Sequence, residues 1–359
     1  MIDVVCYFYD PVKVPLLREG VLPALDEIRG DIRVHVERHW LHGPHLRVRL
    51  DGTDEDAAAR TLARRLRAHL RQHPSTVDIS REALLARARQ TGLAELLKPP
   101  YEPIHPDNTV ALEPSDTGRV RELLGSAALV ELRAEGLRLG LPAVRASLVE
   151  GSAERVRLAT TALATHASRY PPGLGHGYHS YVSHLEDFLL HSDSDGSVRA
   201  RLDALWQRNA DQATELVERV ADGHPTDRVE AAWQAWTIAN RLGVEDAYDR
   251  GELTAEPNPR YGERAYELGD RPSIQRYNLA ERTKFSEYHT KLWQVDLDDP
   301  LIKRPLAVYR FGTNVLYQLL AICDVTPMER YLAARLVVGA TERITGLTWA
   351  DRLNAMVRA

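Results

Sequence analysis

The chain has 359 residues, enough to bury a large hydrophobic core, and this length suggests two or three subdomains. Its hydrophobic fraction of 44% and charged fraction of 27% are those of a globular protein. A net charge of −5 excludes general polyanion binding, and the two cysteines, Cys6 and Cys323, predict neither a disulfide framework nor a cysteine zinc site.

The start of the chain carries no basic segment followed by an apolar one, so we expect no signal peptide. No apolar run approaches the ~18 residues that a membrane-spanning helix needs. We therefore expect a cytoplasmic protein that binds neither membrane nor nucleic acid.

The first part of the chain predicts a small antiparallel sheet with helices. Strands are predicted at 2–9, 31–40 and 45–50, and helices at 14–30 and 53–73. Gly30 suits the end of the first helix, and Gly43-Pro44 suits a turn between the second and third strands. This βαββα order indicates an α+β fold that begins with a ferredoxin-like unit.

The rest of the chain is expected to be largely helical. Loops rich in proline and polar residues are predicted at 98–118 and 251–273, with a Pro-, Gly- and His-rich break at 170–180. The predicted helices are 119–170, 181–193, 199–220, 227–243, 274–294, 305–322 and 327–345. We expect region 1–118 to hold the sheet and region 119–359 to hold the active site, the two forming one integrated unit.

The predicted hairpin collects positive and titratable side chains on one face. Alternation along its strands places five of them together: Arg33, His35, His45, Arg47 and Arg49. A solvated sheet face is one interpretation. Like charges on neighbouring strands repel, so an anionic partner is the other interpretation.

The helix predicted at 53–73 carries a second basic group, which includes Arg64, Arg65 and Arg67. A solvated helix face explains it, and so does a groove that binds an acidic peptide segment.

Residues 176–191 contain four histidines, but their spacing matches no zinc motif and no carboxylates complete a metal site. A single catalytic or structural histidine is therefore favoured over a metal centre. The segment GLGHG at 173–177 follows no predicted strand, and the chain contains neither a Walker A sequence nor a G-x-S-x-G elbow. Conventional nucleotide enzymes and serine hydrolases lose their support.

Two predicted helices hold candidate proton carriers. RTKFSEYHTKLW (282–293) places Ser286 and His289 three residues apart beside Tyr288, and YRFGTNVLYQLL (309–320) carries Thr313 and Tyr317. Aromatic residues at helical spacing are often core residues, an interpretation that is weakest for Ser286 and Tyr317.

Two stretches together resemble the thiopeptide-type bacteriocin biosynthesis family, which is related to the C-terminal glutamate-elimination domain of class I lantibiotic dehydratases. The first is the hairpin W…GPHLRVRL at 40–50, and the second is GYHSYVSHLEDF at 177–188. In the second stretch the matching residues are Gly177, Tyr178, Ser180, Ser183, His184, Glu186 and Phe188.

The resemblance implies one of two chemistries. Some members eliminate glutamate from glutamylated Ser or Thr. Others, the pyridine or dehydropiperidine synthases, join two dehydroalanines by a formal [4+2] aza-cycloaddition, and pyridine formers also expel the leader peptide.

Departures from the family pattern favour the synthases. Tyr101 and Pro103 of an eliminating motif remain here, but the Arg-Tyr-Gly-Gly that should follow them is missing. Eliminating members also carry a His before an Asn-Arg pair near the C-terminus, where this chain has Thr313, Tyr317 and Gln318. A stand-alone glutamate-elimination enzyme and a non-catalytic precursor-binding partner remain the alternatives.

The resemblance then implies roles for individual residues without a metal or a cofactor. We expect Ser286 and Tyr317 to be hydrogen-bond donors at the reacting amide and His184 to be the acid and base of the later eliminations. Tyr288 and Glu102 are expected to bind substrate.

The expected partner is a leader-bearing precursor peptide, with other biosynthetic enzymes of the pathway as further partners. Such leaders are typically acidic, so Arg47 and Arg49 of the hairpin, or Arg64, Arg65 and Arg67 of the following helix, are expected to bind the leader.

Overall fold

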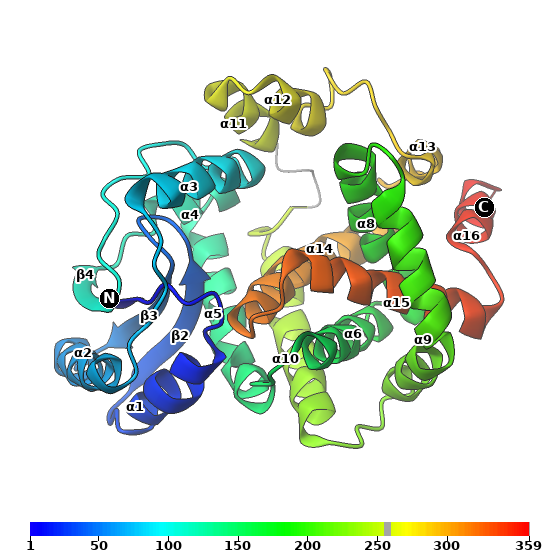
Figure 1. Ribbon diagram of the computed structural model, residues 1–359. Coiled ribbons are helices and arrows are strands. Elements are labelled where there is room, and N and C mark those ends of the chain that lie inside the picture. Colours follow the sequence, from blue (N-terminus) through cyan, green and yellow to red (C-terminus); the bar gives the residue numbers. More distant parts are fainter. Residues whose placement is uncertain (255–259, 359) are drawn as a thin grey trace. The chain divides into compact units, whose positions relative to one another are not determined.

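The computed structural model describes residues 1–254 and 260–358 and divides them into two compact units (Figure 1). Unit 1 comprises Met1–Leu148, Glu256–Arg282 and Ala321–Asp324. Unit 2 comprises Val149–Ala255, Thr283–Leu320 and Val325–Ala359. The chain thus enters unit 1 three times, and unit 1 includes helices beyond residue 118 that the sequence groups with the helical region.

Unit 1 is built on one four-stranded antiparallel sheet with the order β2-β3-β1-β4. The strands are β1 (Ile2–Tyr7), β2 (Ile32–His39), β3 (His45–Gly52) and β4 (Thr109–Pro114). Together with the helices that follow β1 and β3, this order is that of a ferredoxin-like unit, so the predicted α+β class is confirmed.

Unit 1 also contains helices. They are the π-helical turn η1 (Leu16–Val21), α1 (Leu22–Asp26), α2 (Glu55–Gln72), α3 (Arg81–Glu95), α4 (Gly118–Leu124), α5 (Ala127–Ala146), α11 (Arg260–Leu268) and α12 (Arg271–Tyr277). Helix α2 packs against β1, β3 and β4, and α5 packs against β2. Buried leucines of α2 at 62, 66 and 70 form one stripe, which explains why this strongly basic helix still packs on the sheet.

Three predictions for unit 1 need correction. Strand β4 lies inside the segment 98–118 that was predicted as loop, because an edge strand tolerates the proline and acidic residues around Val110. Helix α11 lies inside the polar segment predicted as loop at 251–273, of which residues 255–259 fall outside the described residues. The helix predicted at 14–30 is shorter and starts with a π-helical turn.

Unit 2 contains helices and no strand among its described residues. They are α6 (Ser152–Ser168), α7 (Leu174–Gly177), α8 (His179–Ser192), α9 (Ser197–Ala221), α10 (Arg228–Asp249), α13 (Glu287–Leu292), α14 (Pro300–Ile322), α15 (Pro327–Thr345) and α16 (Trp349–Arg358). The last residues of α14 belong to unit 1. The helix predicted at 274–294 is wrong as one element, since α12 ends at Tyr277 and α13 begins only at Glu287.

Helix α6 is the centre of unit 2. Every residue from Leu158 to Ala167 is buried, and α6 packs against α15, α9 and α10. A Cβ atom at Gly177 would collide with the carbonyl of Ala167, so glycine is required where the chain passes closest to α6. This close approach sets the position at which α8 begins.

None of the helices in the described ranges combines the length and hydropathy that spanning a membrane requires. Cys6 and Cys323 are both buried and unpaired.

Candidate active site

Helices α8 and α14 bring together two residues that the sequence predicts to be catalytic. The Nδ1 atom of His184 lies 2.8 Å from the hydroxyl oxygen of Tyr317, and their ring centroids are 5.4 Å apart. Arg330 of α15 covers the ring of Tyr317, with its guanidinium carbon 4.2 Å from the ring centroid. Three helices therefore fix one histidine–tyrosine pair under a cation.

The surroundings keep both members of this pair uncharged at neutral pH. Burial lowers the pKa of His184 to about 4, and the positive charge of Arg330 acts in the same direction. Burial raises the pKa of Tyr317, although Arg330 opposes this. A neutral imidazole beside a neutral phenol can exchange a hydrogen with a bound amide without separating charge.

A second chain of hydrogen bonds joins α8 to α13. The Nε2 atom of His289 lies 3.0 Å from the hydroxyl oxygen of Ser183, and its Nδ1 atom lies 2.8 Å from that of Ser286. Ser286 is also the N-cap of α13 and accepts the backbone N–H of His289 at 3.3 Å. In a neutral imidazole one ring nitrogen donates and the other accepts, so this serine–histidine–serine chain has a direction that reverses with the tautomer.

The two groups form one cluster. Ser183 and His184 are consecutive on α8, and His289 lies near enough to His184 that protonation of His289 lowers the pKa of His184. We refer to these five residues, Ser183, His184, Ser286, His289 and Tyr317, as the α8 cluster. It offers hydroxyl and imidazole groups that donate and accept protons within one small region.

Tyr288 is buried beside the cluster. Its hydroxyl donates to the carbonyl of His179 at 3.1 Å and lies 3.3 Å from the Nδ1 atom of the same residue. Its ring makes an edge contact with Trp349, at 5.4 Å between centroids. Because only 1% of Tyr288 is exposed, the substrate contact predicted for it would require its surroundings to move.

Thr313 and Gln318, on which the sequence prediction against glutamate elimination rests, have local partners. Thr313 donates to the carbonyl of Tyr309 at 2.9 Å, so its oxygen accepts the Nε2–H of His166 at 3.1 Å. Gln318 donates to the carbonyl of Asn314 at 3.2 Å. Burial lowers the pKa of His166 to about 4, which keeps this second histidine neutral.

The hairpin arginines in unit 1 meet acids of their own sheet. Arg49 is 4% exposed and donates two hydrogen bonds of 2.7 Å to Asp3, its cross-strand neighbour on β1. The Nε atom of Arg47 lies 3.4 Å from Asp3. The charge of Arg49 is thus neutralised inside the protein, and its predicted leader contact stays a prediction.

Glu37 is the second internal acid of this face. It binds Arg133 of α5 at 2.8 Å and the Nε2 atom of His35 at 3.1 Å. Burial raises the pKa of Glu37, but Arg133 and His35 outweigh burial and bring it well below its usual range. Around Asp3 and Glu37 this face of the sheet is therefore a buried charge network beside α5, whereas Arg33 is exposed and pairs with Asp51.

The other predicted binding residues of unit 1 are exposed. Arg64 lies on the outer face of α2, Arg65 binds Glu27 at 2.7 Å, and Arg67 donates to the carbonyl of Val110 at 2.8 Å. Glu102 is paired with Arg81 at 2.6 Å. These side chains are accessible to a binding partner. They belong to unit 1, and the α8 cluster belongs to unit 2.

Three residues of the site were not predicted as such. The sequence indicates His289 only through its spacing from Ser286, indicates Ser183 only as part of the stretch 177–188, and gives no indication of Arg330. The spacing of Ser286 and His289 was a usable signal because an N-cap contacts the third residue of its helix. No local signal indicates that Ser183 or Arg330, from other helices, would join them.

In the part of the chain that the structure describes, no three His, Cys, Asp or Glu side chains lie together as they would to bind a metal ion.

Comparisons with known proteins give relatives by structure alone. No family model matches the chain, and no curated protein matches it by sequence. A solved pyridine synthase, TbtD from thiomuracin biosynthesis, is similar over 96% of this chain and 98% of its own, with a TM-score of 0.70 and 21% identity. The solved structure of TsrL is similar over 100% of this chain and 98% of its own, with a TM-score of 0.63 and 18% identity.

The likeness extends from one end of the chain to the other in both cases, so it includes the sheet, the long helices and the segments between them. The resemblance inferred from the residues is confirmed at the level of the fold: this chain has the fold of a thiopeptide pyridine synthase.

Proposed function

We propose that this chain is a thiopeptide biosynthetic enzyme, a pyridine or dehydropiperidine synthase. It catalyses the formal [4+2] aza-cycloaddition between two dehydroalanines of a ribosomal precursor peptide, followed by dehydration and elimination of the leader peptide. The observation that carries the proposal is the full-length fold likeness to a pyridine synthase. The proton-carrying groups of the α8 cluster support it.

The first task of such an enzyme is entropic. Two alkenes far apart in a peptide must be held ~3–3.5 Å from each other, and correct positioning supplies ~7–11 kcal/mol of the barrier reduction. No covalent intermediate with the protein is needed. Hydrogen-bonding side chains on rigid helices, as in the α8 cluster, suit this task.

The second task is to make one amide behave as a 2-azadiene, which requires its imidic-acid tautomer. A donor at one amide atom and an acceptor at the other stabilise that form. Tyr317 and Ser286 act as the donors. Tyr317 has one hydroxyl hydrogen, so while it donates to the amide, the Nδ1–H of the neutral His184, 2.8 Å away, donates to Tyr317.

The third task is to break bonds in the cyclic adduct. Dehydration requires an acid at the leaving hydroxyl, and expulsion of the leader as a carboxamide requires one proton to be removed and one delivered. His184 serves as acid and base in these steps. The chain Ser183–His289–Ser286 carries the second proton, since a change of tautomer moves a hydrogen from one serine to the other.

Recognition of the leader is assigned to the exposed basic face of α2. Arg64 and Arg65 are exposed there, whereas Arg49 is neutralised by Asp3. Salt screens exposed charges, so about 0.5 M salt should weaken leader binding severalfold. The Arg64→Gln, Arg65→Gln double variant should bind leader more weakly, and the matched control is Arg201→Gln with Arg208→Gln on exposed positions of α9. Equal affinities of the two double variants would move the leader site away from α2.

Intact-mass measurement tests the activity. The purified protein is mixed with a leader-bearing thiazole peptide that contains dehydroalanines. Loss of water together with loss of the leader is the expected result for a pyridine former, and cyclisation that retains the leader is expected for a dehydropiperidine former.

The same experiment separates the alternatives. Loss of glutamate from a glutamylated peptide would identify an elimination enzyme. Binding of the peptide with no chemical change would identify a non-catalytic partner. Either of these results contradicts the proposal.

A further inference from the structure

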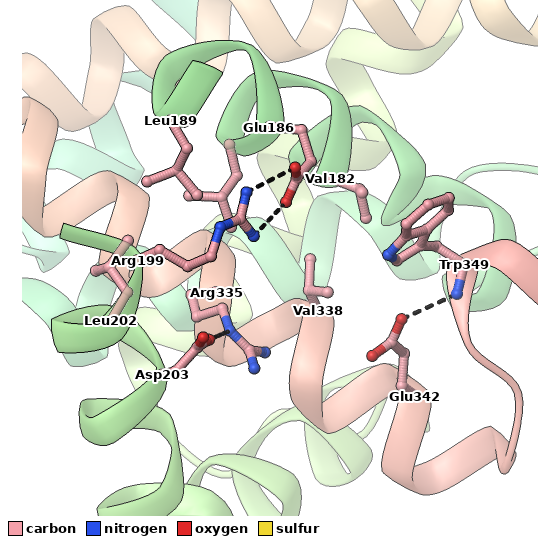
Figure 2. Close-up of a pocket in the computed structure, with 11 residues that line it drawn as sticks. Val182, Glu186, Leu189, Arg199, Leu202, Asp203, Arg335, Val338, Glu342 and Trp349 are labelled. Atoms are coloured by element: carbon pink, nitrogen blue, oxygen red, sulfur yellow. Dashed lines mark hydrogen bonds and ion pairs between the residues drawn. The ribbon is translucent and has the colours of Figure 1, made fainter. Parts of the chain in front are cut away.

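Helix α8 borders a pocket of about 210 Å³ (Figure 2). Helices α9 and α15 and the first residue of α16 complete its walls. Residues 182, 185, 186 and 189 form one stripe of α8, whereas His184 projects from the other side of the same helix. The pocket and the α8 cluster are thus back to back.

The walls combine an apolar surface with charged groups. The apolar residues are Val182, Leu185, Leu189, Leu202, Val338 and Trp349. Glu186 and Arg199 bind each other through two hydrogen bonds of 2.9 and 2.8 Å (Figure 2). Each therefore already uses its main charged contact within the protein and not with a ligand. This pair closes one end of the pocket.

Two other charged residues keep hydrogen-bonding capacity. Arg335 uses only its Nε atom, at 2.7 Å from Asp203, and its two terminal nitrogens make no hydrogen bond within the described part of the chain (Figure 2). Glu342 accepts the backbone N–H of Trp349 at 2.9 Å with one oxygen, and its other oxygen accepts none from the described residues. The pocket therefore presents donors at Arg335 and an acceptor at Glu342.

The spacing of Arg335 and Glu342 on α15 gives the distance between the donor and the acceptor. Arg335, Val338 and Glu342 lie on one stripe of the helix, at positions i, i+3 and i+7. At 1.5 Å per residue the first and last are roughly 10 Å apart along the helix axis. An extended peptide rises ~3.3 Å per residue, so about three residues span this distance.

We infer that this pocket binds a short extended segment of the peptide substrate, with a backbone carbonyl at Arg335, a backbone N–H at Glu342 and an apolar side chain against Leu185, Leu189 and Val338. That the segment belongs to a thiopeptide precursor rests on the proposed function. The pocket chemistry itself calls only for a peptide.

The balance of charges selects a neutral ligand. Glu186 with Arg199 and Asp203 with Arg335 form two neutral pairs, and Glu342 adds a negative charge at the far end. An anion at Arg335 meets these three carboxylates, and a cation at Glu342 meets the two arginines. A peptide backbone, which carries donors and acceptors without net charge, satisfies both ends.

Position makes the pocket a useful second contact for a long substrate. Trp349 lines the pocket, and its ring contacts Tyr288 at 5.4 Å between centroids. A peptide held here has part of its freedom removed before the reacting residues reach the α8 cluster, which lowers the entropic cost of bringing them together.

Binding of capped tripeptides tests the inference without any turnover. The probes are acetyl-Ala-Leu-Ala-amide and its Asp and Lys analogues, titrated by NMR. The Leu peptide should bind to the wild-type protein at least about fivefold more tightly than the other two, a preference worth about 1 kcal/mol.

The chain provides a matched pair of variants. Arg335 of α15 binds Asp203 of α9 at 2.7 Å, and Arg343 of α15 binds Asp211 of α9 at 2.7 Å, but only Arg335 lines the pocket. Arg335→Gln should weaken binding of the Leu peptide about tenfold, as expected for loss of charge-assisted hydrogen bonds. Arg343→Gln should leave the affinity unchanged.

A second variant, Val338→Phe, fills the pocket and should abolish binding, with a circular dichroism spectrum used to confirm folding. Equal loss in the Arg335 and Arg343 variants, tighter binding of the Asp or Lys peptide, or no binding of the Leu peptide at millimolar concentration would overturn the inference. Because the probes cannot react, binding without any cyclisation of a precursor would refute the proposed function alone.

Discussion

His184 and Tyr317 are 133 residues apart in the chain, yet they share a hydrogen bond of 2.8 Å. The sequence predicted each of them as a catalytic residue, but it contains no signal that they touch. Contact between distant helices depends on how side chains pack around α6, and a pattern within one helix does not record this. The structure adds that the two side chains are coupled, because the tautomer of His184 decides whether the hydroxyl of Tyr317 donates to it or accepts from it.

Tyr317→Phe removes the hydroxyl of this pair and keeps the ring. We expect turnover to fall by about 10²–10⁴, the usual contribution of a positioned proton donor, while the precursor affinity changes little. The matched control is Tyr331→Phe, since Tyr331 also lies beside Arg330 but stacks on Phe188 at 4.0 Å between centroids. Single-turnover mass spectrometry measures both. Full activity of Tyr317→Phe in a folded protein would place the reaction elsewhere.

The arginines of the hairpin have counter-charges within the protein itself. Their like charges were expected to need an anionic partner, and the sheet itself supplies one in Asp3 and Glu37. Asp3 lies on β1, directly opposite Arg49 on β3, and this register could not be read from the hairpin alone. Part of a charge pattern that suggests a binding surface is therefore accounted for by the fold.

Asp3→Asn tests that account. Loss of the carboxylate leaves the guanidinium of Arg49 buried without its counter-charge, so we expect the free energy of unfolding to fall by about 3–5 kcal/mol. Arg64→Gln, at an exposed position of α2, should change it by less than about 0.5 kcal/mol. Urea denaturation measures both values, and equal stability of the two variants would mean that the network contributes nothing.

At the scale of elements, the predictions succeed where side-chain pattern and element coincide. Strands β1, β2 and β3 and helix α2 lie within two residues of their predicted bounds, because alternation and helical spacing there reflect burial on one side. β4 was missed because an edge strand needs little apolar alternation. The prediction also lacks α16, which has only ten residues and follows α15 after a short break at Gly346.

Helix α13 begins at a residue that has a capping role and a predicted catalytic role. Ser286 is its N-cap, so Ser286→Ala loses both a cap worth about 1 kcal/mol and any role in the reaction. Ser286→Asn retains a capping side chain. We expect both variants to lose activity but only the alanine variant to lose about 1 kcal/mol of stability, as measured by thermal unfolding and turnover. An active asparagine variant would reduce Ser286 to a cap.

At the scale of the whole molecule, buried neutral histidines tie stability to pH. Burial lowers the pKa of His39, His166 and His184 to about 4 and that of His179 to about 3. The unfolded chain takes up protons on these rings near pH 6.5, whereas the folded protein does not until about pH 4. Unfolding therefore binds protons in this window, and stability falls as the pH falls through it.

Each such histidine contributes up to about 1.4 kcal/mol per pH unit to the slope. The raised pKa values of Glu95 and Glu342 act in the opposite direction but involve fewer groups. Urea midpoints at pH 7, 6 and 5 should decrease in order. His184→Gln should flatten the decrease by about one proton, whereas His224→Gln, at an exposed position, should not. A midpoint that stays constant from pH 7 to 5 would contradict the expectation.

The α+β class and the identity of three cluster residues were within reach of the sequence, but the division of the chain was not. Residues 321–324, which complete α14 and the turn after it, belong to unit 1, although Tyr317 on the same helix belongs to unit 2. Asp324 explains this assignment, since it accepts the backbone N–H groups of Lys13 and Val14 at 2.7 Å each. Long-range anchoring of this kind leaves no trace in local composition.

The two ion pairs between α9 and α15 have one more consequence. Asp203 and Asp211 are eight residues apart, as are their partners Arg335 and Arg343, and both pairs advance in the same direction. The two helices therefore run parallel, an arrangement in which their dipoles repel each other slightly. Sliding one helix past the other by a single turn would break both bridges at once. Trp206 of α9 packs closely against Gly339 of α15 between the two bridges, so the register, and with it the shape of the peptide pocket, persists when the exposed outer bridge is removed.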